Sequence, residues 1–225
     1  IDGDVAYTGG VNIADEYANL IERFGYWKDS GVCLEGEGAW GLTASFIRMC
    51  VNLGGVMHNE HDYYRPHTPV KSEGFCQPFT DGPQNNPDNP AEDVFLQMIS
   101  GARRFLYITT PYFIPDESLM RALCIAGDGG VDVRLMLPGK PDHWYADCVA
   151  ESYFGELIKH GVKVYRYTPG FLHGKSIMVD REAAFVGSAN MDYRSFELDY
   201  ECGVMVYSVP MIESLLEDMD MIVDR

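Results

Sequence analysis

From about residue 75 onward, short apolar runs alternate with longer stretches whose apolar residues recur three and four positions apart. The short runs predict β-strands and the longer stretches predict amphipathic helices. Regular alternation of the two is typical of an α/β sheet covered by helices. The pattern predicts strands at 75–80, 105–109, 131–137 and 162–167, and helices at 91–101, 117–126 and 145–160.

The end of the chain completes this pattern with a hairpin, a strand and a helix. Apolar runs at 172–179 and 183–187 flank a short polar turn and predict the hairpin. A strand is expected near 200–207, followed by an amphipathic helix from Pro210, because proline suits the first turn of a helix. We therefore expect residues 74–225 to form one complete domain.

The first part of the chain, residues 1–73, is predicted to be the C-terminal remainder of a preceding domain. Its pattern indicates strands at 5–8 and 32–35 and helices at 14–24 and 40–50. The chain begins with apolar and glycine-rich residues and has no initiator methionine. We therefore expect it to be a fragment.

An internal repeat links the two parts. The pattern D-x6-G-[GS]-x-N occurs twice, at a constant offset (180 minus 2 equals 178). This spacing is far longer than the period of solenoid repeats, so it predicts two homologous units. The matched pairs are Asp2 and Asp180, Gly9 and Gly187, and Asn12 and Asn190.

Four side chains around the predicted hairpin can meet at one point. Residues two apart in a strand share a face, so His173 and Lys175 project together, while Gly174 leaves the opposite side open. Ser188 and Asn190 are also two apart, just beyond the second strand, and can aim hydrogen-bond donors at the same point. This combination predicts a pocket for a tetrahedral phosphate.

The predicted pocket has the groups that phosphoryl transfer needs. A neutral imidazole can attack phosphorus, and an imidazolium can protonate a leaving oxygen. Lys175 and Asn190 can stabilise the charge of the non-bridging oxygens, so we expect neither a metal nor another cofactor. Asp180 has two interpretations, since it can belong to the site or can close the hairpin as a structural residue.

The second copy of the pattern, extended upstream to its histidine and lysine, resembles the HKD motif of the phospholipase D superfamily. The first copy resembles the rest of such a motif, whose histidine and lysine would precede Ile1. The resemblance implies an α/β fold, a phospholipase D-like mixed sheet flanked by helices, with two homologous units of which the first is truncated. The complete motif consists of His173, Lys175, Asp180, Gly187, Ser188 and Asn190.

Three segments are similar to those of bacterial cardiolipin synthases in particular. They read TPYFIPD at 110–116, GGVNIADEY at 9–17 and GSANMDYRS at 187–195. The resemblance implies that two phosphatidylglycerol molecules are joined to give cardiolipin and glycerol, through a phosphohistidine intermediate.

The resemblance also implies roles for individual residues. His173 would be the general acid and base, and the nucleophilic histidine would lie outside this chain, which alone is expected to be inert. A carboxylate would orient each histidine, Glu201 behind His173 and Asp29 behind the absent one. The implied catalytic residues are His173, Lys175, Asp180, Asn190, Glu201 and Asp2, and the implied phosphate-binding residues are Ser188, Asn12 and Gly10.

The charge of the chain limits its partners. A formal net charge of -17 repels polyanions, so nucleic acid is not an expected partner. The expected partners are an anionic phospholipid, phosphatidylglycerol, and the membrane surface, which Trp144, Tyr145 and Phe171 can contact. The six cysteines form no Cys-x-x-Cys pair, so reduced thiols are expected.

The expected location is the bacterial cell membrane, with the catalytic domains on the cytoplasmic side. No stretch of the sequence is long and apolar enough to span a bilayer, so the membrane anchor is expected outside this chain. The sequence leaves the oligomeric state open.

Two other functions remain open from the sequence. The first is a phosphodiesterase or nuclease of the same superfamily that uses water as the acceptor. The second is a non-catalytic metal-binding or interaction module built on His58, Glu60, His61, Asp62 and His67, in a polar segment that reads as a loop.

Overall fold

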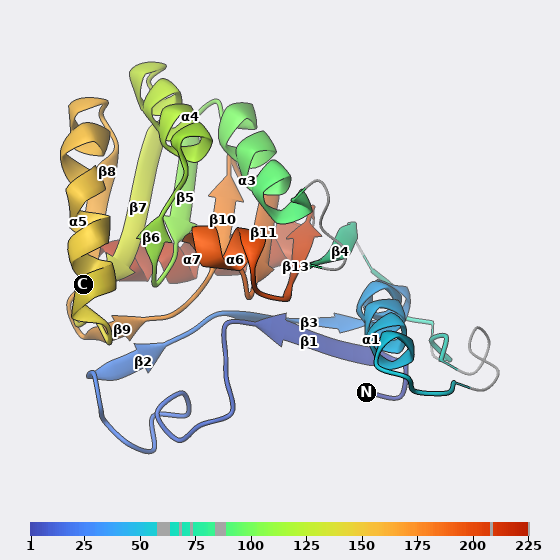
Figure 1. Cartoon of the computed structure of the whole chain (residues 1–225). Coiled ribbons are helices and arrows are strands. Elements are labelled where there is room, and N and C mark those ends of the chain that lie inside the picture. The colour runs from blue at the N-terminus through green and yellow to red at the C-terminus, as the bar shows by residue number, and fades with distance from the viewer. Residues whose placement is uncertain (58–63, 68, 73, 84–88, 208, 225) are drawn as a thin grey trace.

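A mixed sheet of seven strands forms the centre of the computed structural model, which describes residues 1–57, 64–67, 69–72, 74–83, 89–207 and 209–224. In spatial order the strands are β4 (Cys76–Asp81), β13 (Glu201–Val206), β11 (Ala183–Gly187), β10 (Ser176–Val179), β5 (Phe105–Thr109), β7 (Asp132–Pro138) and β8 (Lys163–Tyr167). The last three run parallel to one another, and the others pair antiparallel (Figure 1).

Three helices cover one face of this sheet: α3 (Pro90–Gly101), α4 (Glu117–Asp128) and α5 (Trp144–Lys159) (Figure 1). They bury an apolar layer against the strands, because each helix turns one apolar stripe inward. Residues of this layer include Phe95, Leu106, Leu123, Leu135, Leu157 and Phe185.

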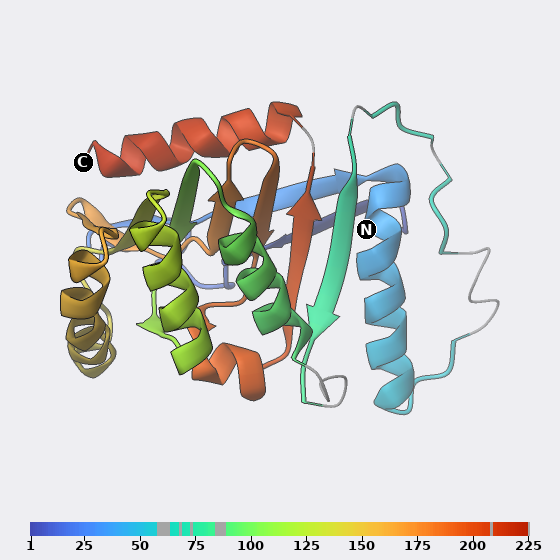
Figure 2. The same ribbon diagram turned by 90° about the horizontal axis from the view of Figure 1, so that it is seen from above.

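The opposite face is covered by α7 (Val209–Val223) (Figure 2), and a two-stranded ribbon of β1 (Val5–Gly9) and β3 (Gly31–Glu35) runs across one end of the sheet (Figure 1). The ribbon contributes the buried side chains Val32 and Leu34 to a second apolar cluster. The first part of the chain is therefore anchored to the sheet of the second part. This cluster also contains Tyr107, Met136, Met178, Val204, Leu216 and Met219.

Helix α1 (Trp40–Asn52) follows a short 3-10 turn, η1 (Gly36–Ala39), and lies beside the edge strand β4 (Figure 2). It approaches β4 closely, since a Cβ added to Gly41 would lie 2.9 Å from the Pro78 ring. Its outer face exposes Phe46 and Met49.

Several short elements lie near the end of the sheet that faces the ribbon. β2 (Tyr26–Lys28) pairs in parallel with β9 (Gly170–Leu172). β6 (Phe113–Ile114) pairs in parallel with β12 (Met191–Asp192), and α6 (Tyr193–Glu197) follows directly. These pairs hold the chain segments that carry the predicted motif.

Most elements expected in the second part of the chain are present within two residues of their predicted bounds. The helix expected at 14–24 is wrong, since this segment forms turns and bends, and Asn19 has a positive φ of 55°. Leu20 and Ile21, which would form its apolar face, are exposed. A helix of this length gains most of its stability by packing an apolar face, and here that face lies against nothing in the described part of the chain.

The two copies of the sequence repeat adopt matching local structures. Asp2 and Asp180 both have left-handed backbone conformations, with φ of 53° and 54°. β1 and β11 begin three residues after these aspartates and end at the motif glycines. The repeat therefore extends from the sequence to the backbone of the turn and the strand.

The glycines of the two copies make the same close approach to the next strand. Gly9 lies opposite Gly31, and Gly187 lies opposite Gly203. A Cβ on Gly9 would lie 2.6 Å from the Gly31 Cα, and one on Gly187 would lie 2.8 Å from the Gly203 Cα. Both distances are too short for a side chain, so each of these strand pairs requires glycine at this position.

Candidate active site

The predicted catalytic histidine lies where the two parts of the chain meet. β2 pairs with β9 so that Lys28 lies opposite Leu172, the last residue of each strand. Asp29 and His173 follow directly. The His173 N–H donates to the Lys28 carbonyl at 2.6 Å. Asp29, which follows Lys28, is thereby placed against the His173 ring.

His173 and Asp29 form a buried hydrogen-bonded pair. The Nδ1 atom of His173 lies 2.7 Å from Oδ2 of Asp29, and the side chains are 8% and 7% exposed. The other Asp29 oxygen accepts the Ser30 N–H at 2.9 Å. The carboxylate therefore fixes the ring orientation and keeps a proton on Nδ1, which leaves Nε2 for chemistry.

Lys175 shares the predicted face with His173. Its Nζ lies 2.9 Å and 3.0 Å from the two ring nitrogens of His173 and donates to the His173 carbonyl at 2.7 Å. Gly174, between them, allows Ser30 to approach from the other side, since a Cβ there would lie 2.9 Å from the Ser30 hydroxyl. The structure thus brings the imidazole and the cation together.

Three aromatic rings surround His173. Tyr17, Trp27 and Phe171 have ring centroids 5.2, 5.4 and 5.5 Å from the imidazole. Phe171 is fully buried and packs in the core instead of contacting lipid, whereas Trp144 and Tyr145 are exposed. The apolar wall limits access of water to the ring.

Burial and charge set the protonation of His173 and Lys175. Burial lowers the pKa of His173, the Asp29 hydrogen bond opposes this change, and the neighbouring Lys175 charge lowers the pKa further. Burial also lowers the pKa of Lys175 to about 7, against the attraction of surrounding carboxylates. Lys175 can therefore exchange a proton near neutral pH, whereas the lowered pKa of His173 favours its neutral imidazole.

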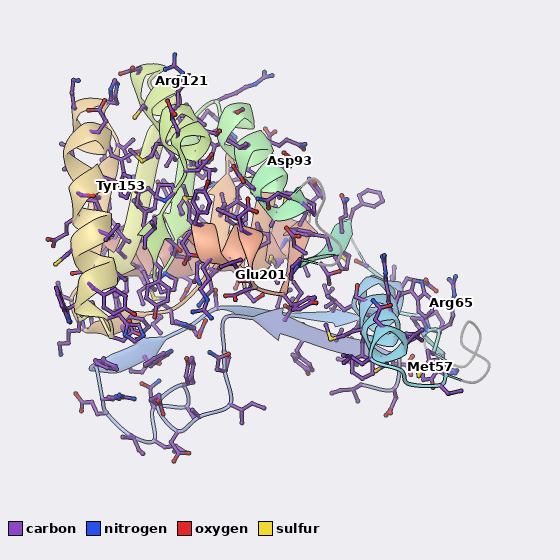
Figure 3. The ribbon with its side chains drawn as sticks, in the orientation of Figure 1. Met57, Arg65, Asp93, Arg121, Tyr153 and Glu201 are labelled. Carbon is purple, nitrogen blue, oxygen red and sulfur yellow. The ribbon has the colours of Figure 1, made fainter. Side chains whose placement is uncertain are left out.

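Glu201 lies in the same region but does not orient His173. Its carboxylate accepts a hydrogen bond from the Ser188 hydroxyl, and Figure 3 places it at the end of the sheet that faces the β1–β3 ribbon. Burial raises its pKa, and hydrogen bonds from Ser188 and Ser195 lower it. Asp29 therefore takes the place behind His173 that was predicted for Glu201.

Asp29 and Glu201 are equivalent positions of the repeat. Each stands two residues before the glycine, Gly31 or Gly203, that faces the motif glycine on the neighbouring strand. The sequence therefore singled out Asp29 as an orienting carboxylate but assigned it to the absent histidine, whereas it lies against His173. Asp29 lies beside His173 because it directly follows β2, which pairs with β9 of the second part of the chain.

Ser188 and Asn190 are held by a local network. The Ser188 N–H donates to the Cys202 carbonyl at 2.9 Å, and its hydroxyl is engaged with Glu201. The Asn190 amide donates to the Ser195 hydroxyl at 3.2 Å, while its Oδ1 is buried with no hydrogen-bond partner among the described residues. The Oδ1 atom of Asn190 is thus unpaired among the described residues, whereas the Ser188 hydroxyl is occupied by its hydrogen bond to Glu201.

The first copy contributes Gly10 and Asn12 to the surroundings of His173. A Cβ on Gly10 would lie 2.2 Å from the Asp29 carboxylate and 2.8 Å from the His173 carbonyl. The Gly10 N–H already donates to the Ser30 carbonyl at 3.1 Å, so the phosphate contact expected for it is replaced by a packing role. Asn12 donates to the Tyr17 hydroxyl at 2.8 Å and so supports the aromatic wall.

Asp180 and Asp2 lie away from this cluster. Asp180 follows the last residue of β10, at the opposite end of that strand from Lys175. Its carboxylate accepts hydrogen bonds from the N–H groups of Arg103, Arg104 and Phe105, each at 2.8 Å. Of its two interpretations we therefore propose the structural one, and Asp2 occupies the same turn position before β1.

Sequence reasoning missed Tyr17, Trp27, Tyr112 and Asp142. The Tyr112 hydroxyl donates to Asp142 at 2.6 Å, and the Asp142 charge acts on both His173 and Lys175. Tyr112 lies in the TPYFIPD segment that was used only as a family signature. No sequence pattern pointed to Asp142, because its position depends on the conformation of the loop between β7 and α5.

Two negative observations concern the described residues. They contain no group of three or more His, Cys, Asp or Glu side chains able to hold a metal ion. Four residues of the alternative metal module, His58, Glu60, His61 and Asp62, lie outside the described residues. None of the helices in the described ranges has the length and apolar character needed to cross a membrane.

The chain is similar to known proteins over nearly its whole length. A family model described as "Cardiolipin synthase, PLD-like domain" matches residues 95–223. A cardiolipin synthase of Listeria welshimeri is 39% identical over 226 residues, which is 97% of this chain and 46% of that protein. A cardiolipin synthase of Halalkalibacterium halodurans is 40% identical over 97% of this chain and 43% of its own length. The chain thus spans about half the length of these curated relatives.

Solved structures with this fold have lower sequence identity. A phosphatidylserine synthase from Haemophilus influenzae matches with a TM-score of 0.69 and 15% identity, over 100% of this chain and 60% of that one. Nuc, a phospholipase D family member from Salmonella typhimurium, matches with a TM-score of 0.55 and 21% identity, over 66% of this chain and 93% of that one. These matches confirm the phospholipase D-like α/β fold expected from the sequence.

Proposed function

Because the chain belongs to the family of cardiolipin synthases with phospholipase D-like domains, we propose that the protein that contains it transfers a phosphatidyl group between two phosphatidylglycerol molecules. The products are cardiolipin and glycerol. The observation that supports this proposal best is the buried arrangement of Asp29, His173 and Lys175, which combines an oriented imidazole with a cation. The chain covers about half of its curated relatives, so the remaining groups belong to the whole protein.

His173 is the general acid and base of the proposed reaction. A second histidine, supplied by a part of the protein outside this chain, attacks phosphorus through its neutral imidazole. The bond from phosphorus to the glycerol oxygen breaks, and the His173 imidazolium gives its proton to that oxygen. The hydroxyl of a second phosphatidylglycerol then loses its proton to His173 and attacks phosphorus, which breaks the bond to the nucleophilic histidine.

The surrounding groups stabilise charge during both steps. Lys175 supplies the cation for the non-bridging oxygens, and Asn190 supplies a neutral amide. Glu201, the repeat equivalent of Asp29, is proposed to orient the second histidine as Asp29 orients His173. The proposed partners are phosphatidylglycerol and the membrane surface, and the proposed location is the cytoplasmic side of the bacterial cell membrane.

The test uses the full-length protein that contains this chain. It is incubated with phosphatidylglycerol vesicles, and the lipid and water-soluble products are identified by mass spectrometry. Cardiolipin and glycerol are expected, and both should disappear in the His173→Ala variant. Phosphatidic acid in place of cardiolipin would show that water is the acceptor and would overturn the proposed transfer.

A further inference from the structure

Asp142 and Tyr112 form a polar pair beside the catalytic residues that the proposed chemistry leaves unused. Tyr112 directly precedes β6, and Asn190 directly precedes β12, so the parallel pairing of these strands sets the two residues side by side. Asp142 lies in the loop between β7 and α5. That loop is tied to β9 by the Lys140 N–H, which donates to the Gly170 carbonyl at 3.3 Å.

One oxygen of Asp142 is left without a hydrogen-bond donor in the described part of the chain. Its Oδ2 accepts the Tyr112 hydroxyl at 2.6 Å. Its Oδ1 is buried and has no hydrogen-bond partner among the residues that the structure describes, in a side chain that is 15% exposed. A buried carboxylate oxygen without a donor is unfavourable, so the position is suited to a donor that arrives with a ligand.

The tyrosine keeps Asp142 in place as an acceptor. Burial raises the pKa of Tyr112, and the hydrogen bond to Asp142 raises it further, so the phenol stays protonated and donates to the carboxylate. The Tyr112 ring stacks on His143 at a centroid distance of 6.2 Å, and His143 stacks on Tyr145 at 5.4 Å. This row of rings holds the hydroxyl in one orientation.

The charges around the pair define the kind of group that fits there. The Asp142 carboxylate lies close enough to His173 and Lys175 for its charge to raise the pKa of both. A phosphate oxygen would be repelled by this carboxylate and is better placed at Lys175. An ammonium group would add a second cation near Lys175, whereas a neutral hydroxyl donates a hydrogen bond without adding charge.

We propose that Asp142 Oδ1 accepts a hydrogen bond from a free hydroxyl of the glycerol headgroup while the phosphodiester lies at Lys175 and Asn190. This inference rests on the proposed function and extends it to headgroup selection. Asp142 is thus a specificity-determining residue, and Tyr112 is the positioning residue that holds it. The site selects polyol headgroups over headgroups that lack a hydroxyl donor.

The experiment compares two substrates with the full-length protein. Phosphatidylglycerol is compared with phosphatidylpropanol, which carries the same phosphodiester but no free headgroup hydroxyl. The ratio of kcat/KM for release of the two alcohols measures selection, and loss of a hydrogen bond to a charged group is expected to lower it about tenfold in Asp142→Asn. Tyr112→Phe should lower the ratio in the same direction by about threefold, because the carboxylate loses its positioning donor.

A matched control removes a carboxylate from the same region. Glu151 lies on α5, is 59% exposed and pairs with Arg166, so Glu151→Gln should leave the ratio unchanged. An unchanged ratio in Asp142→Asn, or an equal loss on both substrates in both site variants, would overturn the inference. Absence of cardiolipin with the unaltered protein would instead overturn the proposed function, which separates the two failures.

Discussion

The Asp29 carboxylate lies 2.7 Å from Nδ1 of His173, although the two residues are 144 positions apart in the chain. The contact joins the first part of the chain to the second part at the imidazole that we propose to be catalytic. It depends on three residue pairs between β2 and β9. A carboxylate from one unit of the repeat therefore controls the histidine of the other, which couples the chemistry to the packing of the two units.

The first prediction concerns this contact. Asp29→Asn should lower kcat of the full-length protein by about a hundredfold, because the amide holds the imidazolium less well and no longer fixes its tautomer. The measurement is the rate of cardiolipin formation from phosphatidylglycerol vesicles at saturating lipid. The KM should change much less, since Asp29 is expected to contact the histidine and not the substrate.

Asp128 provides a control for the loss of one negative charge. It is 60% exposed and pairs with His160 at the end of α4. Asp128→Asn should leave kcat within about twofold of the unaltered protein, as is usual for an exposed pair. If Asp29→Asn were no slower than this control, the assigned orientation of His173 would be wrong.

The second prediction is a pH dependence set by Lys175. Its pKa of about 7 means that the free site is cationic below this pH and loses the charge above it. The value of kcat/KM should therefore fall above pH 7, since a neutral amine binds phosphate poorly. The carboxylates that face this lysine, and that oppose the effect of burial, are Asp29, Glu201, Asp192 and Asp142.

Lys175→Arg tests the origin of this decrease. Arginine keeps its charge at all accessible pH values, so the variant should be slower but should lose the fall in kcat/KM between pH 7 and about pH 9. The two profiles are measured with the same vesicles. A fall that persists unchanged in Lys175→Arg would assign the titration to another group, with His173 as the next candidate because burial lowers its pKa too.

The sequence predicted the residues that depend on local geometry. The strand expected at 172–179 is interrupted, since residues 173–175 lie between β9 and β10, but Lys175 Nζ still lies 2.9 Å from His173 Nε2 as the shared face required. The partner of His173 could not be predicted in the same way. It depends on the pairing of Tyr26–Lys28 with Gly170–Leu172, two short segments without a strong strand pattern.

The helix expected at 14–24 failed for a related reason. Its sequence has a helical apolar pattern, but Leu20 and Ile21 are mostly exposed and belong to neither apolar cluster of the described chain. Tertiary contacts instead hold the segment in turns, for example through the two hydrogen bonds between the Asn19 side chain and the Trp27 backbone. Periodicity therefore located apolar residues correctly but not the structure that they adopt.

The third prediction concerns Gly203, which lies opposite Gly187 where β13 pairs with β11. A Cβ on Gly203 would lie 2.1 Å from the Phe185 ring, which is itself fully buried. Gly203→Ala should therefore destabilise the protein by about 1 to 3 kcal/mol through overpacking. Gly155→Ala is the control, because this position in α5 has open space and alanine favours a helix interior. Thermal unfolding should show a lower midpoint for the first variant and an equal or higher midpoint for the second.

The fourth prediction separates a structural from a catalytic role for Asp180. Asparagine tolerates its positive φ of 54° but offers one acceptor oxygen to three backbone N–H groups. Asp180→Asn should therefore lower the free energy of unfolding by about 2 kcal/mol at pH 7, while kcat per folded molecule stays within about threefold.

The pH dependence of this loss provides a second check on Asp180. Burial raises its pKa, but the hydrogen bonds from Phe105, Arg103 and Arg104 outweigh that effect and hold the pKa below its usual value. A carboxylate with a lowered folded-state pKa stabilises the fold at neutral pH, and this contribution disappears as the pH falls through that pKa. The stability difference between the unaltered protein and Asp180→Asn should therefore shrink as the pH falls below about 4. A large loss of kcat in fully folded Asp180→Asn, with no change in stability, would instead show that Asp180 has a catalytic role.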